Sequence, residues 1–365
     1  MTATCVAFDV GPLHGPRTGI GAAVDAMHTA LRSRDDVELR DYLISSRAQV
    51  GEATTRLPIP AAAAHRLWSR IDRPSMDRWL GGIDVVHGTN YVVPPTRRPR
   101  LVSVYDCWFL RNPSAATPSV RRAGEVLRRS IAAGATVHAC SQSTAAAVRE
   151  FFPGAEIVTI ALGPLNVPAA AAAVPLADVA GRPFILSIGT LERRKNVPTL
   201  VRAFGAVAAE HPEVALVIAG GDGDDRRDID LAIDALGPVA ARRVFLTGRI
   251  DEPTRGWMLR NAAVLAYPSL DEGFGFPLLD AMQVGLPIVA SDVGSIPELT
   301  ADVALLSSPH DSESLAAHLL AALTDSQLAG RLTAAGATRW RSYSWTRCAD
   351  DLVKTYNNLA ERGRR

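Results

Sequence analysis

Two acidic residues, Glu272 and Asp280, stand eight positions apart around a glycine-rich turn in the last third of the chain. The segment from Ser269 to Gly285 reads SLDEGFGFPLLDAMQVG. Pro277 suits the first position of a helix and Gly285 its end, so we expect a helix of about two turns with Asp280 in the first turn. A helix start favours a bound phosphate, and carboxylates beside it can hold hydroxyl groups. The segment therefore predicts a site for a sugar nucleotide.

A cluster of cations follows the strand expected at 184–188. The strand leads through Gly189 and Thr190 to a run in which Arg194 and Lys195 are adjacent. At the carboxyl edge of a parallel sheet, such a pair would neutralise a diphosphate. The alternative is a solvated charge cluster with Asn196 capping the next helix, and the run alone does not decide between the two.

Three other loops of this half bear on the same site. Gly248, Arg249 and Ile250 follow an expected strand, where backbone groups could contact the edge of a base. The segment 291–298 forms another loop and helix start, and we expect it to border the site. Acidic residues at 222–225 resemble an Asp-x-Asp metal motif, but a turn with Asp224 or Asp225 capping a helix is the better interpretation, and we predict no metal.

The first half offers polar residues at expected strand ends. A loop at 11–21 is too irregular for the dinucleotide-binding glycine pattern, so we expect a flexible loop and no nicotinamide enzyme. Candidates for contact with the transferred group or its acceptor are His87, Asn90, Tyr105 and Asp106. For His87, the alternative is a structural hydrogen-bonding role. No serine-elbow, zinc-protease or Walker motif is present, which disfavours hydrolase and kinase functions.

Composition narrows the class of protein. The chain has 365 residues, 47% of them hydrophobic and 21% charged, which suits about two globular domains. A net charge of +1 provides no footprint for nucleic acid, so we expect no nucleic-acid partner. The four cysteines lack metal-ligand spacing, and neither a basic leader nor a membrane-spanning apolar run is found. We therefore expect a cytoplasmic protein with reduced thiols.

Strand-length apolar runs alternate with helical patterns throughout, which is typical of parallel α/β units. We expect strands at 5–10, 37–44, 84–87, 101–105, 136–140 and 157–162, and then at 184–188, 214–219, 244–247, 264–267, 287–290 and 303–306. Helices are expected at 18–32, 118–133 and 141–152 in the first half, and between strands in the second. A proline- and alanine-rich stretch marks a linker. The prediction is an α/β chain of two doubly wound, Rossmann-like domains facing across a cleft, at 1–166 and 184–344, joined by 167–183.

Taken together in this order, these motifs resemble family 4 of the retaining glycosyltransferases, which have the two-domain GT-B fold. The resemblance is strong from about Phe184 onward. Before that point it is weaker, and Thr18 to Gly21 and Val86 to Tyr91 resemble bacterial mannosyltransferase-like members. The resemblance implies that the first domain binds the acceptor and that a C-terminal helix at 345–365 crosses back onto it.

The resemblance also implies residue roles. Arg194 and Lys195 match the pair that neutralises the donor diphosphate, and Glu272 matches the acid that contacts the donor sugar; these three are the catalytic candidates. Gly19 and Gly21 match a loop that closes over the donor. The full set of expected donor contacts is Gly19, Gly21, Gly189, Thr190, Gly248, Arg249, Ile250, Gly273, Phe274, Gly275, Phe276 and Asp280. Catalysis in this family needs neither metal nor cofactor.

The chain departs from the family pattern at two positions. Asp280 replaces a glutamate and is shorter by one C–C bond, about 1.5 Å, so a ribose contact would need closer packing or a bridging water. Tyr105 replaces a histidine found in many members, and tyrosine could donate a hydrogen bond in its place.

The expected function is transfer of a hexose from a nucleotide diphosphate sugar to a sugar, lipid or small-molecule hydroxyl, with retention of configuration. GDP-mannose is the preferred donor, from the mannosyltransferase-like first half alone. Alternatives are a donor-binding accessory subunit without turnover, and a nucleotide-sugar epimerase, which the lack of an evident acid/base pair disfavours. Arginine-rich helical segments at 66–73 and 121–129 suggest peripheral contact with the inner face of a membrane, although solvated helix faces explain them as well.

Overall fold

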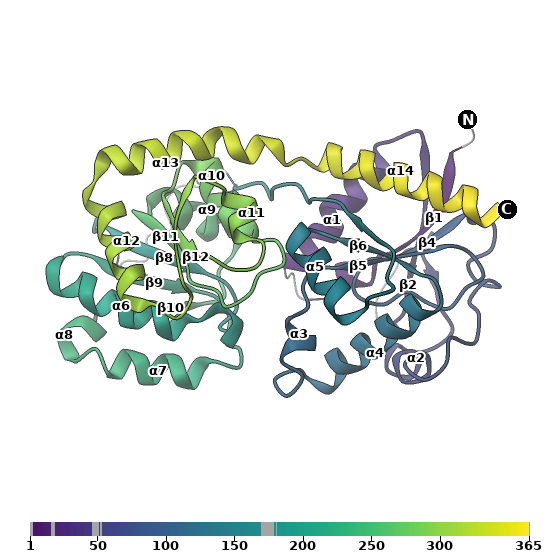
Figure 1. The fold of residues 1–365 in the computed structure, drawn as a ribbon, viewed down its shortest axis with the longest axis horizontal. Coiled ribbons are helices and arrows are strands. Elements are labelled where there is room, and N and C mark those ends of the chain that lie inside the picture. The colour runs from purple at the N-terminus through teal and green to yellow at the C-terminus, as the bar shows by residue number, and fades with distance from the viewer. Residues whose placement is uncertain are drawn as a thin grey trace. The chain divides into compact units, whose positions relative to one another are not determined.

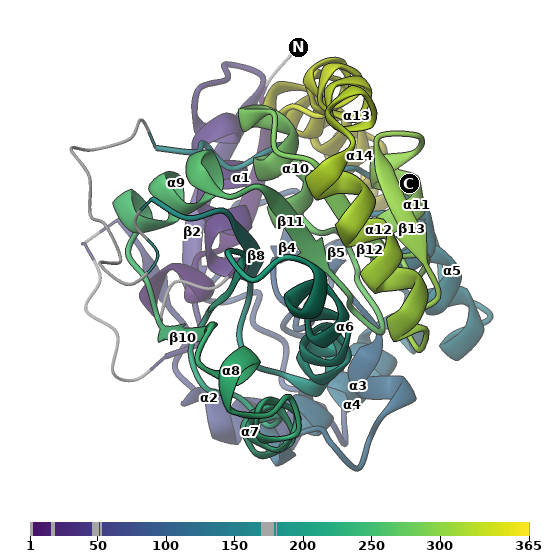
Figure 2. The ribbon, with the colours of Figure 1, turned by 90° about the vertical axis from the view of Figure 1, so that its left-hand side faces the viewer.

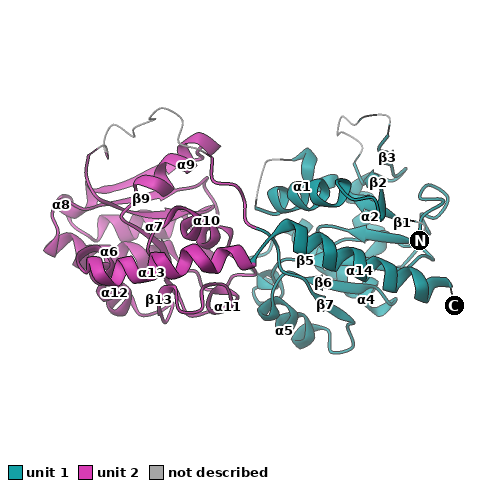
Figure 3. Cartoon of the chain, turned by 90° about the horizontal axis from the view of Figure 1, so that it is seen from above, with its two compact units in different colours: residues 1–163, 343–365 teal, residues 164–342 magenta. Residues whose placement is uncertain are grey.

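The computed structural model describes residues 3–15, 19–45, 51, 53–168, 179 and 181–364. The chain forms two compact units (Figure 3). Unit 1 comprises Met1–Gly163 and Tyr343–Arg365, and unit 2 comprises Pro164–Ser342. Each unit is an α/β layered structure.

Unit 1 is built on a parallel sheet in the order β3-β2-β1-β4-β5-β6-β7 (Figure 1). Its inner strands are buried along their whole length, as expected for a parallel sheet covered on both faces. The strands are β1 Thr4–Asp9, β2 Val37–Leu43, β3 Thr55–Arg56, β4 Val85–Gly88, β5 Arg100–Val104, β6 Thr136–Ala139 and β7 Ile157–Thr159.

Helices cover both faces of this sheet. They are η1 Gly11–His14, α1 Gly19–Arg32, α2 Ala61–Trp68, α3 Trp108–Arg111, α4 Pro118–Ala132, α5 Gln142–Phe151 and α14 Trp345–Arg364. The C-terminal helix α14 packs on α1, β1 and β4, so the two ends of the chain meet in unit 1. Its inward face, including Cys348, Leu352 and Tyr356, is fully buried, which anchors it to the sheet.

Unit 2 repeats the architecture with a parallel sheet in the order β10-β9-β8-β11-β12-β13. The strands are β8 Phe184–Ile188, β9 Ala215–Ala219, β10 Val244–Gly248, β11 Val264–Tyr267, β12 Ile288–Ser291 and β13 Ala304–Ser307. The helices are η2 Arg193–Lys195, α6 Val197–Glu210, α7 Arg226–Asp234, α8 Pro238–Ala241, α9 Glu252–Asn261, α10 Phe276–Val284, α11 Ile296–Thr300, α12 Ser312–Thr324, α13 Ser326–Arg339 and η3 Trp340–Ser342. Helices α6 and α12 pack side by side on one face of the sheet (Figure 2).

The α/β class with two doubly wound sheets is confirmed. Every strand expected from the sequence is present, most with ends shifted by one residue; β7 is three residues shorter. Strand β3 and helix α3 were not predicted, because elements of two and four residues carry too little periodicity to be recognised. The helical segment expected at 66–73 corresponds to α2, which runs from Ala61 to Trp68. Most of the linker expected at 167–183 lies outside the described residues.

Candidate active site

The candidate site of unit 2 lies where the strand order reverses. Strand β8 pairs with β9 on one side and with β11 on the other, and all three are parallel. Connections that leave a parallel sheet in opposite directions create a crevice at the carboxyl ends of the strands. The loops that follow β8 and β11 meet there, and a narrow hollow between them is lined by Gly189, Lys195, Tyr267 and Ser269.

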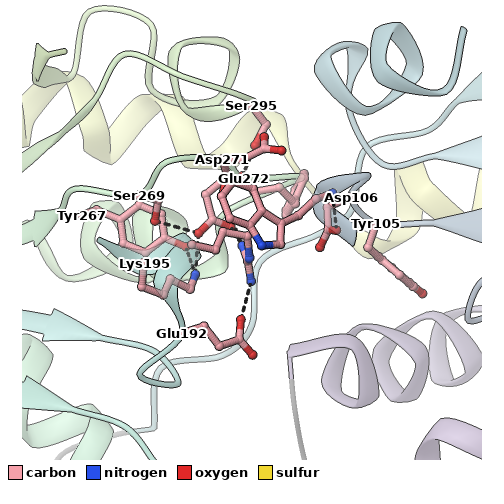
Figure 4. Close-up of polar contacts among 12 residues, drawn as sticks. Tyr105, Asp106, Glu192, Lys195, Tyr267, Ser269, Asp271, Glu272 and Ser295 are labelled. Atoms are coloured by element: carbon pink, nitrogen blue, oxygen red, sulfur yellow. Dashed lines mark hydrogen bonds and ion pairs between the residues drawn. The ribbon is translucent and has the colours of Figure 1, made fainter. Parts of the chain in front are cut away.

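Glu272 and the two adjacent cations form an ion cluster at this point (Figure 4). The Arg194 Nη1 lies 2.8 Å from Glu272 Oε2, and the Lys195 Nζ lies 2.5 Å from Glu272 Oε1. Arg194 is also 3.4 Å from the carboxylate of Glu192. The cations come from η2 and the acid from the loop after β11, so the fold brings together two motifs 77 residues apart.

This cluster is largely buried, and its charges shift one another's pKa values. Glu272 is 5% exposed. Burial by itself would raise the pKa of Glu272, but the charges of Lys195 and Arg194 outweigh it and lower the pKa to about 2. Burial lowers the pKa of Lys195, and Arg194 adds to that, while Glu272 works against both. The carboxylate is therefore ionised at neutral pH. Arg194, Lys195 and Glu272 together carry a net charge of +1, which the more exposed carboxylate of Glu192 offsets in part.

The alternative of a solvated charge cluster is thus wrong for Arg194 and Lys195. Their side chains are 16% and 15% exposed. Asn196 does not cap the next helix through its side chain; instead its Nδ2 donates to the carbonyls of Pro268 and Pro309, at 2.9 and 2.7 Å. The bond to Pro268 ties the end of η2 to the loop that carries Glu272, and the bond to Pro309 ties it to the segment after β13.

Two site residues were missed by the sequence analysis. Tyr267, the last residue of β11, accepts a hydrogen bond of 2.9 Å from Lys195 Nζ, and burial raises its pKa, so the phenol is neutral. The Ser269 hydroxyl donates to Glu272 Oε1 at 2.9 Å. The position of Tyr267 at a strand end was the signal that could have identified it, since polar tips at that edge face ligands.

The loop after β12 holds the Glu272 segment in place, as expected for the segment 291–298. The Ser295 N–H donates to the Glu272 carbonyl, and its hydroxyl donates to the Phe274 carbonyl, both at 2.9 Å. Gly294 has φ +59°, and a Cβ there would lie 2.5 Å from the Glu272 carbonyl oxygen. Only glycine fits this close approach.

The second acid is placed differently from the expectation. Helix α10 begins at Phe276, one residue before Pro277, so Asp280 lies in the second turn and not in the first. Asp280 is 3% exposed and pairs with Arg255 of α9 at 2.5 Å. Its carboxylate is therefore not accessible to a hydroxyl group of a ligand. Burial raises the pKa of Asp280 to about 7 despite Arg255, and its Oδ1 has no hydrogen-bond partner among the described residues. Arg255 gave no signal in the sequence.

The other unit 2 residues that were expected to contact the donor lie at or after the ends of β8 and β10, or just before or at the start of α10. Thr190, Gly248 and Arg249 are exposed, and the Ile250 side chain is half-buried. Gly273, Phe274 and Gly275 are buried in the loop before α10, and the rings of Phe274 and Phe276 stand 5.2 Å apart.

The acidic loop at 222–225 behaves as a turn. Asp225 precedes α7 as predicted, although its side chain makes no capping bond, and Asp224 accepts from the Arg193 N–H at 2.9 Å. Asp222 pairs with Arg226 at 3.0 Å. Within the described ranges, no group of three or more His, Cys, Asp or Glu side chains could hold a metal ion.

In unit 1, the prediction that His87 contacts the transferred group or its acceptor is wrong. His87 is completely buried, with Nδ1 2.7 Å from the Tyr356 hydroxyl and Nε2 2.8 Å from the Ser103 hydroxyl. Burial also holds its pKa well below the usual value. Both ring nitrogens are satisfied by the protein, so His87 is a structural residue and not a substrate contact.

The prediction that Tyr105 donates a hydrogen bond to the donor is also wrong. Tyr105 is 7% exposed, and its hydroxyl donates to the Thr89 carbonyl at 2.9 Å. The hydrogen bond that it could offer a donor is therefore already made within unit 1.

Asn90 and Asp106 remain candidates at strand ends of unit 1. Both side chains are half-buried; Asn90 Oδ1 lacks a partner in the described part of the chain, and Asp106 Oδ1 accepts from the Trp108 N–H at 3.1 Å. Gly19 and Gly21 were expected in a closing loop, but they form the first turn of α1. Pro16, Arg17 and Thr18 of that loop lie outside the described residues. The four cysteines are free and buried.

Unit 2 resembles known proteins in sequence. Residues 175–339 match the family model described as "Glycosyl transferases group 1". O-antigen chain mannosyltransferase B of Escherichia coli is 30% identical over 185 residues, which is 50% of this chain and 48% of the relative. The chain thus spans about half the length of this curated relative.

Two solved structures cover nearly the whole chain. WaaG, a glycosyltransferase involved in lipopolysaccharide biosynthesis, aligns with a TM-score of 0.71 at 18% identity, over 96% of this chain and 99% of that one. Alr3699/HepE of Anabaena, solved in complex with UDP and glucose, aligns with a TM-score of 0.69 at 18% identity, over 96% and 99%.

The two Rossmann-like units are those of the GT-B fold of glycosyltransferases. Unit 2, through residues 175–339, is a glycosyltransferase group 1 domain.

Proposed function

We propose that this chain is a retaining glycosyltransferase that transfers a hexose from a nucleotide diphosphate sugar to a hydroxyl group of a sugar, lipid or small molecule. The observation that carries the proposal is the buried cluster of Arg194, Lys195 and Glu272 at the point where the sheet order of unit 2 reverses. Its two cations suit a diphosphate, and its buried acid suits sugar hydroxyl groups.

Hydrogen-bond capacity supports these roles. Lys195 has three N–H donors, and the described structure accounts for two of them, on Glu272 and Tyr267. A carboxylate offers about four lone pairs, and Glu272 uses three, on Lys195, Ser269 and Arg194. One donor and one acceptor remain side by side, which is the combination that a sugar diphosphate needs.

The proposed reaction is a same-face displacement. The bond between the anomeric carbon and the diphosphate oxygen breaks, the acceptor oxygen bonds to that carbon on the same face, and the acceptor proton passes to the leaving diphosphate. Arg194 and Lys195 would stabilise the charge that develops on the leaving group, while Glu272 orients the sugar. Asn90 and Asp106 stay proposed contacts on the acceptor side.

Mannose from GDP-mannose is the preferred donor within this proposal. The mannosyltransferase named among the relatives supports the sugar. A thermal-shift panel of nucleotide sugars and free nucleotides tests the donor, because a ligand that binds only the folded state raises the melting temperature. Selective stabilisation by GDP-mannose is expected. A larger shift with UDP-glucose would replace the preferred donor, and no shift with any nucleotide sugar would contradict the proposed function.

A donor-binding subunit without turnover is a second candidate, and the pairing of Asp280 with Arg255 is the observation that favours it. Nuclear magnetic resonance of the reaction mixture decides between the two. A product with the anomeric configuration of the donor supports the retaining transferase. Donor binding with neither a transfer product nor hydrolysis of the donor supports the second candidate.

Peripheral contact with a membrane remains part of the proposal. Among the helices that the structure describes, none is both long and apolar enough to cross a bilayer. We expect a larger fraction of the protein to sediment with anionic vesicles than with neutral vesicles. Equal fractions would contradict the proposed membrane contact.

A further inference from the structure

A hollow in unit 1 is surrounded by positive charge. It lies between helices α2 and α4, which pack against each other (Figure 1), and has a volume of about 420 Å³. Arg66 and Arg70 line it from the α2 side, and Arg121 and Arg122 line it from α4, together with Ser69 and Glu125. None of these residues belongs to the candidate active site.

The charge around this hollow is not neutralised within the protein. Four guanidinium groups and one carboxylate line it, a net charge of +3. In the described part of the chain, no ion pair or hydrogen bond is found for the side chains of Arg66, Arg70 and Arg122. Arg121 donates to the backbone carbonyl of Ala116 at 2.5 Å, which leaves its charge uncompensated.

Some other arginines of the same unit have carboxylate partners, although Arg97 and Arg98 have no ion pair in the described part of the chain. Arg34, Arg100 and Arg111 each pair with a carboxylate, at 2.5 to 3.0 Å. Like charges held around one hollow repel each other, and solvent screens this repulsion only in part because Arg122 is half-buried. The positive field that the four arginines share favours a bound anion.

The geometry favours a phosphate over a carboxylate. Guanidinium groups bind carboxylate and phosphate oxygens alike in a two-pronged manner, but the tetrahedral oxygens of a phosphate can accept hydrogen bonds from groups on two helices at once. Pro118, the first residue of the 15-residue helix α4, also lines the hollow, so the positive end of the helix dipole adds to the field. The open space exceeds what a single carboxylate would fill.

We propose that the hollow between α2 and α4 is a second anion site, which binds a ligand carrying a phosphate or diphosphate group. The ligand is either a free phosphorylated molecule or the headgroup of an anionic lipid. The exposed side chains of Ile71 and Val120, 48% and 40% exposed, adjoin Arg70 and Arg121 in the sequence and could rest on a lipid surface. This proposal does not depend on the activity of unit 2.

Hydrogen-exchange mass spectrometry of the full chain tests the site. One arm uses inorganic pyrophosphate, with sodium chloride at matched ionic strength as reference. Another uses vesicles of phosphatidylglycerol and phosphatidylcholine, with phosphatidylcholine vesicles as reference. The variant is Arg70→Gln with Arg122→Gln, and the matched control is Arg97→Gln with Arg98→Gln, two exposed arginines elsewhere in unit 1.

The expected result is slower exchange in α2 and the first turns of α4, lost in the Arg70 and Arg122 variant and kept in the control. Protection by pyrophosphate indicates a free phosphorylated ligand, and protection by anionic vesicles alone indicates a lipid headgroup. Protection in neither arm, or equal protection by sodium chloride or in the variant, would overturn the proposal. Pyrophosphate bound at the candidate active site would instead protect the segments around Lys195 and Glu272, so the two sites are distinguished.

Discussion

The Lys195 ammonium and the Glu272 carboxylate lie 2.5 Å apart, although 77 residues separate them in the chain. Lys195 is one of two lysines in a sequence that contains 39 basic residues, and it is the one buried beside an acid. A lysine in this position provides a compact charge with three donors, whereas an arginine would present a planar fork.

Removal of the Lys195 charge should destabilise unit 2. Lys195→Met keeps the apolar stem but leaves Glu272 with Arg194 as its single cationic partner within hydrogen-bonding distance in the described structure. Breaking a buried pair from one side costs about 3–5 kcal/mol of unfolding free energy, and we expect that range in urea denaturation. Affinity for a nucleoside diphosphate should fall as well.

The control for this change is Lys354→Met, which alters an exposed lysine of α14 that pairs with Asp351. Its unfolding free energy should stay within about 0.5 kcal/mol of wild type. Equal effects of the two changes would contradict the account of the buried cluster.

Asp280 should make stability depend on pH. Its pKa is raised from 3.8 to about 7 in the folded protein, so the stability contributed by its protonated form is fully present below about pH 3.8 and lost as the pH rises through about 7. Asp280→Asn cannot ionise. Its free energy of unfolding should therefore improve relative to wild type across this interval, by up to about 4 kcal/mol, and level off above it.

Urea denaturation at several pH values measures this trend, with Asp292→Asn, at an exposed site of unit 2, as control. A difference between the Asp280 variant and wild type that does not change with pH would contradict the burial of a titrating carboxyl group at this position.

Adding a single methyl group at Gly294 tests whether its close approach supports the loop that carries Glu272. Gly294→Ala would place a Cβ 2.5 Å from the Glu272 carbonyl oxygen at φ +59°. We expect a loss of about 1–3 kcal/mol in stability and a larger Michaelis constant for the donor, because the loop must move.

Gly330→Ala is the matched control, since this glycine lies inside helix α13 with no atom within 4 Å of an added Cβ. It should stabilise the protein by about 0.5–1 kcal/mol. Unchanged donor kinetics in the Gly294 variant would refute the role of this contact.

The structural role of His87 predicts an effect on stability alone. Tyr356→Phe removes the hydroxyl group that faces His87 Nδ1 and leaves a buried nitrogen without a partner. The expected cost is about 1–3 kcal/mol of unfolding free energy, measured by denaturation, with the Michaelis constant for the donor unchanged. A changed donor constant at unchanged stability would restore His87 as a substrate contact.

The sequence was sufficient for every strand except the two-residue β3, and for the edge at which the site lies, because long apolar runs and the residues after them are local signals. It assigned Glu272, Arg194 and Lys195 to one site but treated the acid and the cations as separate ligand contacts. Their mutual pairing depends on how two loops meet, which a local pattern does not encode.

The errors have similar causes. His87 was considered as a ligand contact because its partner Tyr356 is 269 residues away and could not be anticipated. Asp280 was placed at the end of the first turn instead of the start of the second because α10 begins one residue before its proline, and its partner Arg255 lies on another helix. Long-range partners decided both outcomes.

Donor turnover by a Glu272→Gln variant tests the central claim most directly. The assay measures release of nucleoside diphosphate from GDP-mannose, or from the nucleotide sugar that the thermal-shift panel selects, and includes wild type and Glu313→Gln, which changes an exposed acid of α12. We expect turnover to fall by about a hundredfold or more in Glu272→Gln and to stay at the wild-type rate in Glu313→Gln. Wild-type turnover in the folded Glu272→Gln protein would contradict the assignment of this cluster as the catalytic site.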